Sequence, residues 1–276
     1  RRSRPAGGLR RIVVRMVDRS DAPGGDRTRT VSGTELAIVV AAIVIGALAK
    51  AVTGMGLPLI AIPIASLFVD PADAIVVIAL PNLLANTVLF VGERRSLPET
   101  RDLPVLAVSG VVGAVAGTLL LVNISETPLV IAVVCAISFY VVLFFTHPDL
   151  RTTPETSRRW SPLVGGVAGT FQGAVGISGP IVGSWIHSYR LARGAHIASV
   201  TALFMITGGT QLAVLVASGE LSGRIGAALL ACIPVLATIP LGTRVRRSVS
   251  TRGFDLAIVG MLIVSAVALV AQTVAG

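Results

Sequence analysis

Lys50-Ala-Val-Thr-Gly-Met-Gly-Leu-Pro58 and, 122 positions later, Gln172-Gly-Ala-Val-Gly-Ile-Ser-Gly-Pro180 are two versions of one pattern. Gly54 aligns with Gly176, and Pro58 aligns with Pro180. Each copy interrupts an apolar run with glycine, which permits tight backbone turns, and with proline, which suits the first turn of a new helix. The pattern therefore predicts, in each copy, a helix that ends and restarts inside an apolar segment.

The composition around the two copies is that of a membrane protein. Of the 276 residues, 53% are hydrophobic and 13% are charged, and the mean hydropathy is +0.84. A soluble chain is usually about 25% charged. A helix needs about 20 apolar residues to cross the hydrocarbon layer. Runs of that kind are Ala74–Gly92, Leu103–Val122, Thr127–Thr146, Trp160–His187, Gly194–Gly219, Ile225–Thr243 and Leu256–Gly276, and a shorter pair is Leu36–Ala49 and Ala51–Val69. We predict a multi-pass protein of the cell (inner or plasma) membrane.

The self-similarity extends beyond the two quoted stretches. Ile75 falls on Ile197, and the run around Leu80–Leu89 falls on Ala202–Gln211. Each half reads as a broken apolar pair followed by three plain spans, and such repeats are typical of transporters. We predict an all-α polytopic fold of two structurally similar halves, with eight to ten membrane-embedded helical segments that include broken or re-entrant helices. The predicted divisions are a disordered Arg-rich tail (1–33), a first repeat (34–146), a cytoplasmic linker (147–161) and a second repeat (162–276).

The charges between the spans predict the orientation. Arginine is found in Gly92–Asp102, His147–Ser161, His187–Arg193 and Arg244–Arg252, which the positive-inside rule places in the cytoplasm. Asp70–Asp73, Asn123–Glu126 and Ser218–Gly223 contain neither arginine nor lysine and are expected outside. The two sets alternate if each broken pair enters and leaves on one side, and the first half is then inverted relative to the second. This scheme puts the Arg-rich tail outside, unless the first broken pair crosses an odd number of times.

The interrupted segments are the first candidates for a binding site. Irregular backbone at membrane depth is tolerated where protein buries it or where it lines a cavity. The restarting helices would point several free N–H groups and a positive dipole end into the protein, which suits an anion. The alternative is that the segments are packing kinks. The residues assigned to substrate binding on this basis are Thr53, Gly54, Gly56, Pro58, Gly176, Ser178, Gly179 and Pro180.

Four polar side chains inside apolar runs complete the candidate site. Lys50 could neutralise a bound anion, although it could also extend its side chain to the membrane surface. Gln172 stands at the matching position and can donate hydrogen bonds. Asn82 and Asn86, one helical turn apart, could line a pathway or bond a neighbouring helix. We expect the two breaks to meet around one anion site.

Other chemistries fit the sequence less well. A net charge of +9 can indicate a protein that binds nucleic acid. The arginines lie in the tail and the loops, however, so we expect no nucleic-acid partner. The two cysteines lack metal-ligand spacing, and we expect no metal and no cofactor. Gly176-Ile-Ser178-Gly179 matches a short motif of rhomboid-type intramembrane serine proteases, with His196 as the base. A serine nucleophile needs its base within hydrogen-bond reach, and His196 follows a charged loop, so we expect no catalytic residue and no enzyme.

The paired pattern resembles the sulfite exporter TauE/SafE family of membrane permeases from about Thr34 to the C-terminus. The residues that carry the likeness are the glycines and Lys50 of Gly46–Pro58, the Pro81/Asn82/Asn86 segment, and the glycines of Gly165–Pro180. The resemblance implies a permease for sulfite, an organosulfonate or a related small oxyanion. The partners expected are that small inorganic or organic anion and the lipid bilayer, and a homodimer is compatible with them. An anion channel of the same architecture is the alternative; substrate, direction and coupling ion stay open.

Overall fold

The protein is all-helical throughout the part that the structure describes. The structure, a computed structural model, describes residues 33–146, 151–245, 259–260, 262–264 and 266–271. The predicted disordered tail therefore lies outside the described residues, apart from Gly33. The helices, in chain order, are α2 (Gly33–Thr53), α3 (Leu57–Ala65), α4 (Pro71–Glu93), η1 (Arg94–Glu99), α5 (Leu103–Asn123), α6 (Glu126–Thr146), α7 (Pro154–Val175), α8 (Gly179–Ser188), α9 (Arg193–Ala217) and α10 (Ile225–Val245). The described residues between 259 and 271 are also helical.

The helix boundaries follow the 122-residue offset of the sequence. Helices α2 and α7 end at equivalent positions, and α3 and α8 begin at equivalent positions. The starts of α4 and α9 also correspond, and α5 and α10 correspond at both ends. Sequence identity in these helices is low, so the agreement comes from matched breaks and turns. These boundaries agree with the predicted repeat, whereas the count of eight to ten membrane segments stays a prediction.

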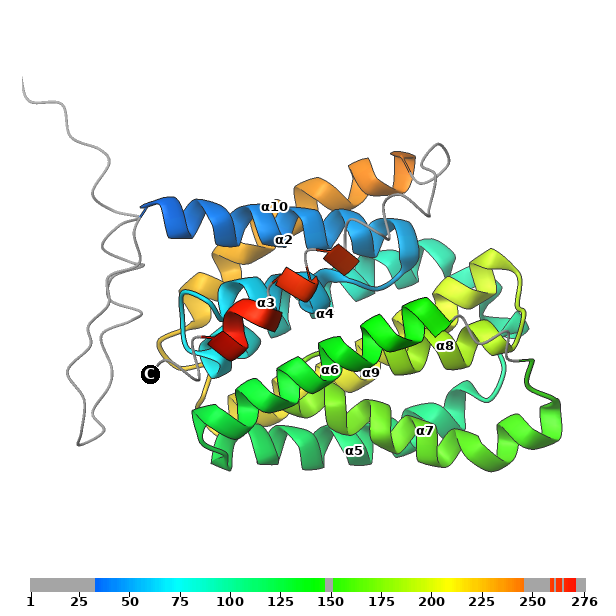
Figure 1. The fold of residues 1–276 in the computed structure, drawn as a ribbon. Helices are drawn as coiled ribbons and strands as arrows, with labels where there is room; N and C mark the ends of the chain where they lie inside the picture. Colours follow the sequence, from blue (N-terminus) through cyan, green and yellow to red (C-terminus); the bar gives the residue numbers. More distant parts are fainter. Residues whose placement is uncertain (1–32, 147–150, 246–258, 261, 265, 272–276) are drawn as a thin grey trace, which may run out of the picture.

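The contacts between helices form a row that reads the same from both ends. Helix α7 packs on α5, α5 on α9, α9 on α4, α4 on α10, and α10 on α2. If each helix is replaced by its equivalent in the other half, the result is the same row of contacts, read from the opposite end. In Figure 1, α2 and α10 lie along one edge of the bundle and α5 and α7 along the opposite edge. The pattern is that of an approximate two-fold relation with α4 and α9 at its centre; whether the halves are inverted stays a prediction.

The second broken pair begins and ends on one side of the bundle. The Thr152 backbone N–H donates to the Ser188 carbonyl at 3.2 Å, and the hydroxyls of the same two residues are 2.7 Å apart. Ser161 on α7 and Tyr189 after α8 are hydrogen-bonded at 3.1 Å. Helix α8 has 10 residues and is therefore about 15 Å long, which is half of a ~30 Å hydrocarbon layer. The pair α7–α8 thus enters and leaves the bundle on one side, and we call it the re-entrant hairpin; its depth in a membrane stays a prediction.

Several arginine-bearing connections meet where this hairpin begins and ends. Arg101 donates to the Thr152 carbonyl at 3.3 Å and to the Ser157 hydroxyl at 2.6 Å. Its guanidinium also lies 4.7 Å from the centre of the Tyr189 ring. Burial raises the pKa of the Tyr189 phenol, so this residue acts as a neutral hydrogen-bonding group. We call this side of the bundle the arginine-bearing face.

The opposite side carries a compact ion-pair cluster. Arg224, which directly follows the arginine-free connection 218–223, lies 2.6 Å from the Asp73 carboxylate and 2.9 Å from the Glu220 carboxylate. Asp73 is in the first turn of α4, whose other end, at Glu93, belongs to the arginine-bearing face. Helix α4 therefore runs from one face to the other.

Among the described residues, four helices are long and apolar enough to cross a membrane: Pro71–Glu99 (with η1), Leu103–Asn123, Arg193–Ala217 and Ile225–Arg244. Shorter apolar helical stretches are Ala37–Thr53, Thr127–Val142 and Leu262–Ala271. Large apolar side chains are exposed on the outside of the bundle; Val108 and Val112 of α5 are 69% and 68% exposed. Such surface suits contact with lipid rather than with water.

Helix α7 already begins at Pro154, inside the predicted linker 147–161, and the division of the chain stays a prediction. Thr153 caps this helix by accepting a hydrogen bond from the Thr156 N–H, and proline at the first helical position is favourable. Hydropathy missed these two turns because their residues are polar. Only residues 151–153 of the linker are described outside the helix.

Helices α5 and α7 pack backbone against backbone through glycines. A Cβ placed on Gly113 would overlap the Gly166 carbonyl oxygen, and one on Gly169 would overlap the Gly110 carbonyl oxygen. Small residues at such positions allow the close helix contact that is common in membranes. The contact fixes the re-entrant hairpin, through α7, against a helix of the first half.

Candidate functional site

Both helix breaks use glycine in a backbone conformation that other residues rarely adopt. Gly54 and Gly56 have φ of 86° and 125°, and Gly176, which ends α7, has φ of 71°. In the first break, the Thr53 hydroxyl accepts the Met55 N–H at 3.2 Å and donates to the Met55 carbonyl at 2.7 Å. The first break is therefore an ordered turn, and α3 and α8 restart from defined positions.

The two breaks lie around one small cavity. It has a volume of about 10 Å³, close to the smallest space that holds one water molecule. Its lining residues come from α2 and α7, from both breaks, from the first turns of α3 and α8, and from α4 and α9: Lys50, Met55, Gly56, Pro58, Leu59, Asn82, Gln172, Ile177, Ser178, Gly179 and Phe204.

The lining is built from equivalent residues of the two halves. Under the 122-residue offset, four pairs of lining residues correspond: Lys50 with Gln172, Met55 with Ile177, Gly56 with Ser178, and Asn82 with Phe204. The cavity is therefore on the approximate two-fold axis that the helix contacts indicate. The two members of each pair differ chemically, so equivalent positions of the two halves bring different charges and side-chain sizes to the cavity.

Lys50 supplies the charge. It is 1% exposed, and its Nζ lies 5.2 Å from the centre of the Phe204 ring. Within the described part of the chain, no carboxylate forms an ion pair with it. A buried ammonium is costly unless another group compensates it, and the aromatic ring provides only part of that compensation. The cavity beside Lys50 is thus an environment that favours an anion.

The opposite wall is a hydrogen-bonded chain of neutral polar groups. Ser178 Oγ donates to Gln172 Oε1 at 2.8 Å, and Gln172 Nε2 donates to Gln211 Oε1 at 3.1 Å. Gln211 Nε2 in turn donates to the Gly173 carbonyl at 3.2 Å. These bonds fix the orientation of the Gln172 amide, and they join α7 to α9.

Asn82 and Asn86 differ from this chain because their amides are not satisfied. Asn82 is 3% exposed and Asn86 is completely buried. The Oδ1 of Asn82 and both polar atoms of the Asn86 amide have no hydrogen-bond partner. Buried polar groups are nearly always paired, so these two amides are unusual among the buried side chains of the described residues.

The structure brings together seven of the twelve residues predicted for the site. The residues that line the cavity are Lys50, Gly56, Pro58, Asn82, Gln172, Ser178 and Gly179. The other five are outside the lining: Thr53, Gly54 and Gly176 shape the breaks, Pro180 is in the first turn of α8, and Asn86 is one turn further along α4.

Sequence reasoning missed the apolar lining residues and Gln211. Phe204 is the most informative omission, because the offset that pairs Lys50 with Gln172 also pairs Asn82 with Phe204. The repeat could therefore have identified it. Met55, Leu59 and Ile177 carry no polar signal, and hydrophobic residues of this kind cannot be told from core residues by sequence.

The geometry around Ser178 gives no support to a serine protease. Its hydroxyl donates to an amide oxygen of Gln172, which is not a base. His187 and His196, whose rings are 6.2 Å apart, are near the ends of α8 and α9 on the arginine-bearing face. Ser178 and His187 are nine residues apart, about 14 Å along α8.

Comparison with known proteins identifies a family for most of the chain. The family model described as "Sulfite exporter TauE/SafE" matches residues 38–269, which includes both breaks and every lining residue of the cavity. No curated protein and no solved structure matches the chain.

Proposed function

The chain belongs to the sulfite exporter TauE/SafE family, and on this premise we propose that it is a permease that moves a small oxyanion across the cell membrane. The substrate class is sulfite, an organosulfonate or a related anion. The proposed binding site is the cavity between the two helix breaks, where Lys50 is the only cationic group among the described lining residues.

The observation that carries the proposal is the buried ammonium of Lys50 beside a cavity. Ionisable residues within membrane segments are costly and are usually functional. An oxyanion in the cavity would supply the missing counter-charge. Loss of Lys50 should then remove binding rather than only weaken the fold.

The rest of the cavity suits the oxygen atoms of such an anion. The first turns of α3 and α8 reach the lining through Gly56 and Gly179, and free N–H groups at helix starts favour negative charge. Ser178 and the amides of Asn82 and Gln172 add neutral hydrogen-bonding groups. A single lysine with neutral donors limits the charge that the site can compensate, which favours small anions of low charge.

The size of the cavity favours a carrier over an open channel. A volume of about 10 Å³ is far too small for sulfite, which has four heavy atoms. The breaks must therefore separate to admit substrate and close again around it. A carrier that alternates between two states performs such a cycle, with the halves moving around a fixed site.

The test uses the purified full chain in proteoliposomes. We expect saturable uptake of at least one anion from a panel of sulfite, sulfate, sulfonates and phosphonates. Preloading the vesicles with the same anion should accelerate uptake, because a carrier returns faster when loaded. Lys50→Gln, which copies the residue of the other half, should show no uptake while it keeps the same elution profile. Uptake by Lys50→Gln at the parent rate would contradict the proposed site.

A further inference from the structure

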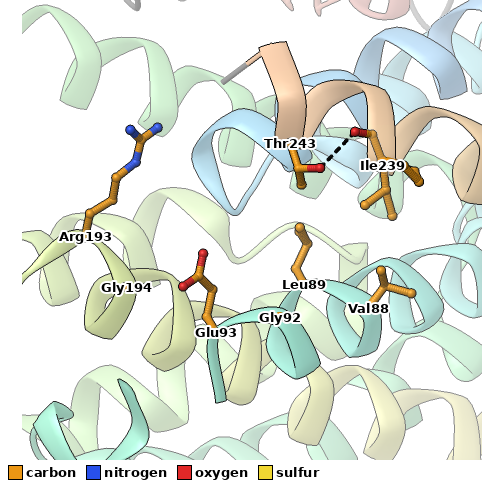
Figure 2. A pocket seen from close by; sticks show the side chains of 9 residues that line it. Val88, Leu89, Gly92, Glu93, Arg193, Gly194, Ile239 and Thr243 are labelled. Carbon is orange, nitrogen blue, oxygen red and sulfur yellow. Dashed lines mark hydrogen bonds between the residues drawn. The ribbon is translucent and has the colours of Figure 1, made fainter. Parts of the chain in front are cut away.

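A second, larger cavity opens on the arginine-bearing face. Its volume is about 600 Å³, and it lies between the end of α4, the start of α9 and the end of α10 (Figure 2). In the figure, Leu89 and Glu93 on α4 face Ile239 and Thr243 on α10. The lining residues are Val88, Leu89, Gly92, Glu93, Arg193, Gly194, Ile239, Pro240 and Thr243.

One face of α4 connects this cavity with the small one. Asn82 lines the small cavity, and Leu89 and Glu93 line the large cavity. Asn86 is between them, and the spacing of four, three and four residues keeps all of them on the same side of the helix. The distance from Asn82 to Glu93 along the helix axis is about 16 Å.

The residue at the middle of this face has an unsatisfied amide. Asn86 is completely buried, and neither atom of its amide has a hydrogen-bond partner. An apolar side chain would fill this position at lower cost, because an unpaired buried amide is destabilising. The amide is explained if a solvated or hydrogen-bonding molecule passes beside it.

We propose that the 600 Å³ cavity is the access vestibule of the small cavity, and that the transported anion passes between the two along the Asn82–Asn86–Leu89 face of α4. The inference rests on the proposed function for the identity of the anion. It assigns a role to Asn86 and to a cavity that is separate from the binding site.

The charge at the mouth of the vestibule is suited to an anion. Glu93 and Arg193 both line the cavity, and the exposed Arg94, Arg95 and Arg244 directly follow the lining residues Glu93 and Thr243 in the sequence. The excess of arginine in these connections gives a positive local field, which raises the local concentration of anions.

The equivalent positions of the other half are more deeply buried at the outer part of the cavity. Glu93 is half-buried, and it corresponds to Leu215, which is completely buried. Pro240 is exposed and Thr243 half-buried, and they correspond to Thr118 and Leu121, which are 0% and 4% exposed. Leu89 and Ile239 are themselves 5% and 1% exposed, so the opening is at Glu93, Pro240 and Thr243. The arginine-bearing face is therefore more open at these positions than the equivalent positions of the other half, as one of the two states of a carrier requires.

The test is thiol labelling in a background without native cysteines, made by Cys135→Ser and Cys232→Ser. Thr243→Cys, on the half-buried wall of the cavity, is treated with a methanethiosulfonate that carries a trimethylammonium-ethyl group, in vesicles of either orientation. This cationic reagent does not cross membranes and is outside the proposed substrate class. We expect labelling from the arginine-bearing face and, after labelling, loss of anion transport. Val88→Cys, on the α4 wall and 38% exposed, is the second variant if Thr243→Cys does not fold. Gln211→Cys should be labelled only from the other face.

Val91→Cys is the matched control, because Val91 is on the same helix as Val88, 48% exposed, and outside the vestibule lining. Its labelling should be slow, since lipid covers it, and should not affect transport. Failure of the reagent to label both Thr243→Cys and Val88→Cys, or transport that survives complete labelling, would overturn the vestibule. If the parent protein moves no anion of the panel while both cysteines are still labelled from this face, the proposed function fails and the vestibule stands.

Discussion

Lys50 and Gln172 stand at equivalent positions of two broken helix pairs, and both line the same cavity. One is charged and the other is a neutral amide held by Ser178 and Gln211. The two-fold arrangement thus places a cation on one wall of the cavity and an ordered hydrogen-bonding group on the other.

Replacing Lys50 should separate stability from transport. Lys50→Met keeps the length of the side chain and removes a buried charge that has no ion-pair partner among the described residues, so we expect an unfolding temperature at or above that of the parent. Anion transport should be lost, and Lys50→Arg should retain part of it. The measurements are thermal unfolding in detergent and uptake by proteoliposomes. A large fall in the unfolding temperature of Lys50→Met would assign the lysine a structural role instead.

Asn86→Leu should stabilise the folded protein and slow its anion transport. The substitution removes an unsatisfied buried amide, whose cost is about 1–3 kcal/mol, and keeps a similar volume. We expect a higher unfolding temperature and slower transport. Gln211→Leu is the contrasting variant: it leaves the Gln172 amide without its acceptor and should destabilise by about 1–3 kcal/mol. If the two substitutions changed the stability equally, this would contradict our description of the Gln211 amide as hydrogen-bonded and the Asn86 amide as unpaired.

The glycine contact between α5 and α7 should not tolerate a side chain. A Cβ on Gly169 would overlap the backbone of Gly110, so Gly169→Val must separate the helices. We expect little folded protein on size-exclusion chromatography. Gly208→Ala is the control, since nothing lies within 4 Å of a Cβ there and alanine favours the helix by about 1 kcal/mol. Normal folding of Gly169→Val would show that the contact is looser than described.

Ser178 should not behave as a nucleophile. Its hydroxyl is bonded to the Gln172 amide, so a fluorophosphonate probe should leave the parent protein unlabelled. Ser178→Ala should weaken anion transport moderately, because Gln172 loses one hydrogen bond. Labelling of the parent that disappears in Ser178→Ala would be evidence for catalysis.

The helix breaks could be predicted because their cause is local. Glycine and proline at matched positions specify where α2 and α7 end and where α3 and α8 restart, whatever the rest of the chain does. The repeat then predicts that the two breaks correspond, and the structure places them around one cavity.

Other features depend on tertiary contacts and leave no local signal. The vestibule is formed by α4, α9 and α10, which meet only in the folded bundle. Whether Asn86 is bonded to a neighbour also depends on what packs against it, and its sequence context does not differ from that of Asn82. The start of α7 was missed for a simpler reason: hydropathy detects spans, whereas Pro154–Ser161 is a polar helical segment.

The palindromic row of helices has a consequence for biosynthesis. Helix α2, which carries Lys50, packs on α10, and about 170 residues separate the end of one from the start of the other. At ~5–20 residues per second, the ribosome needs roughly 10–35 s to supply that partner. During this interval the first half is in the bilayer with the α10-facing side of α2 uncovered, so a nascent chain that stalls before α10 should be a preferred substrate of membrane quality-control proteases.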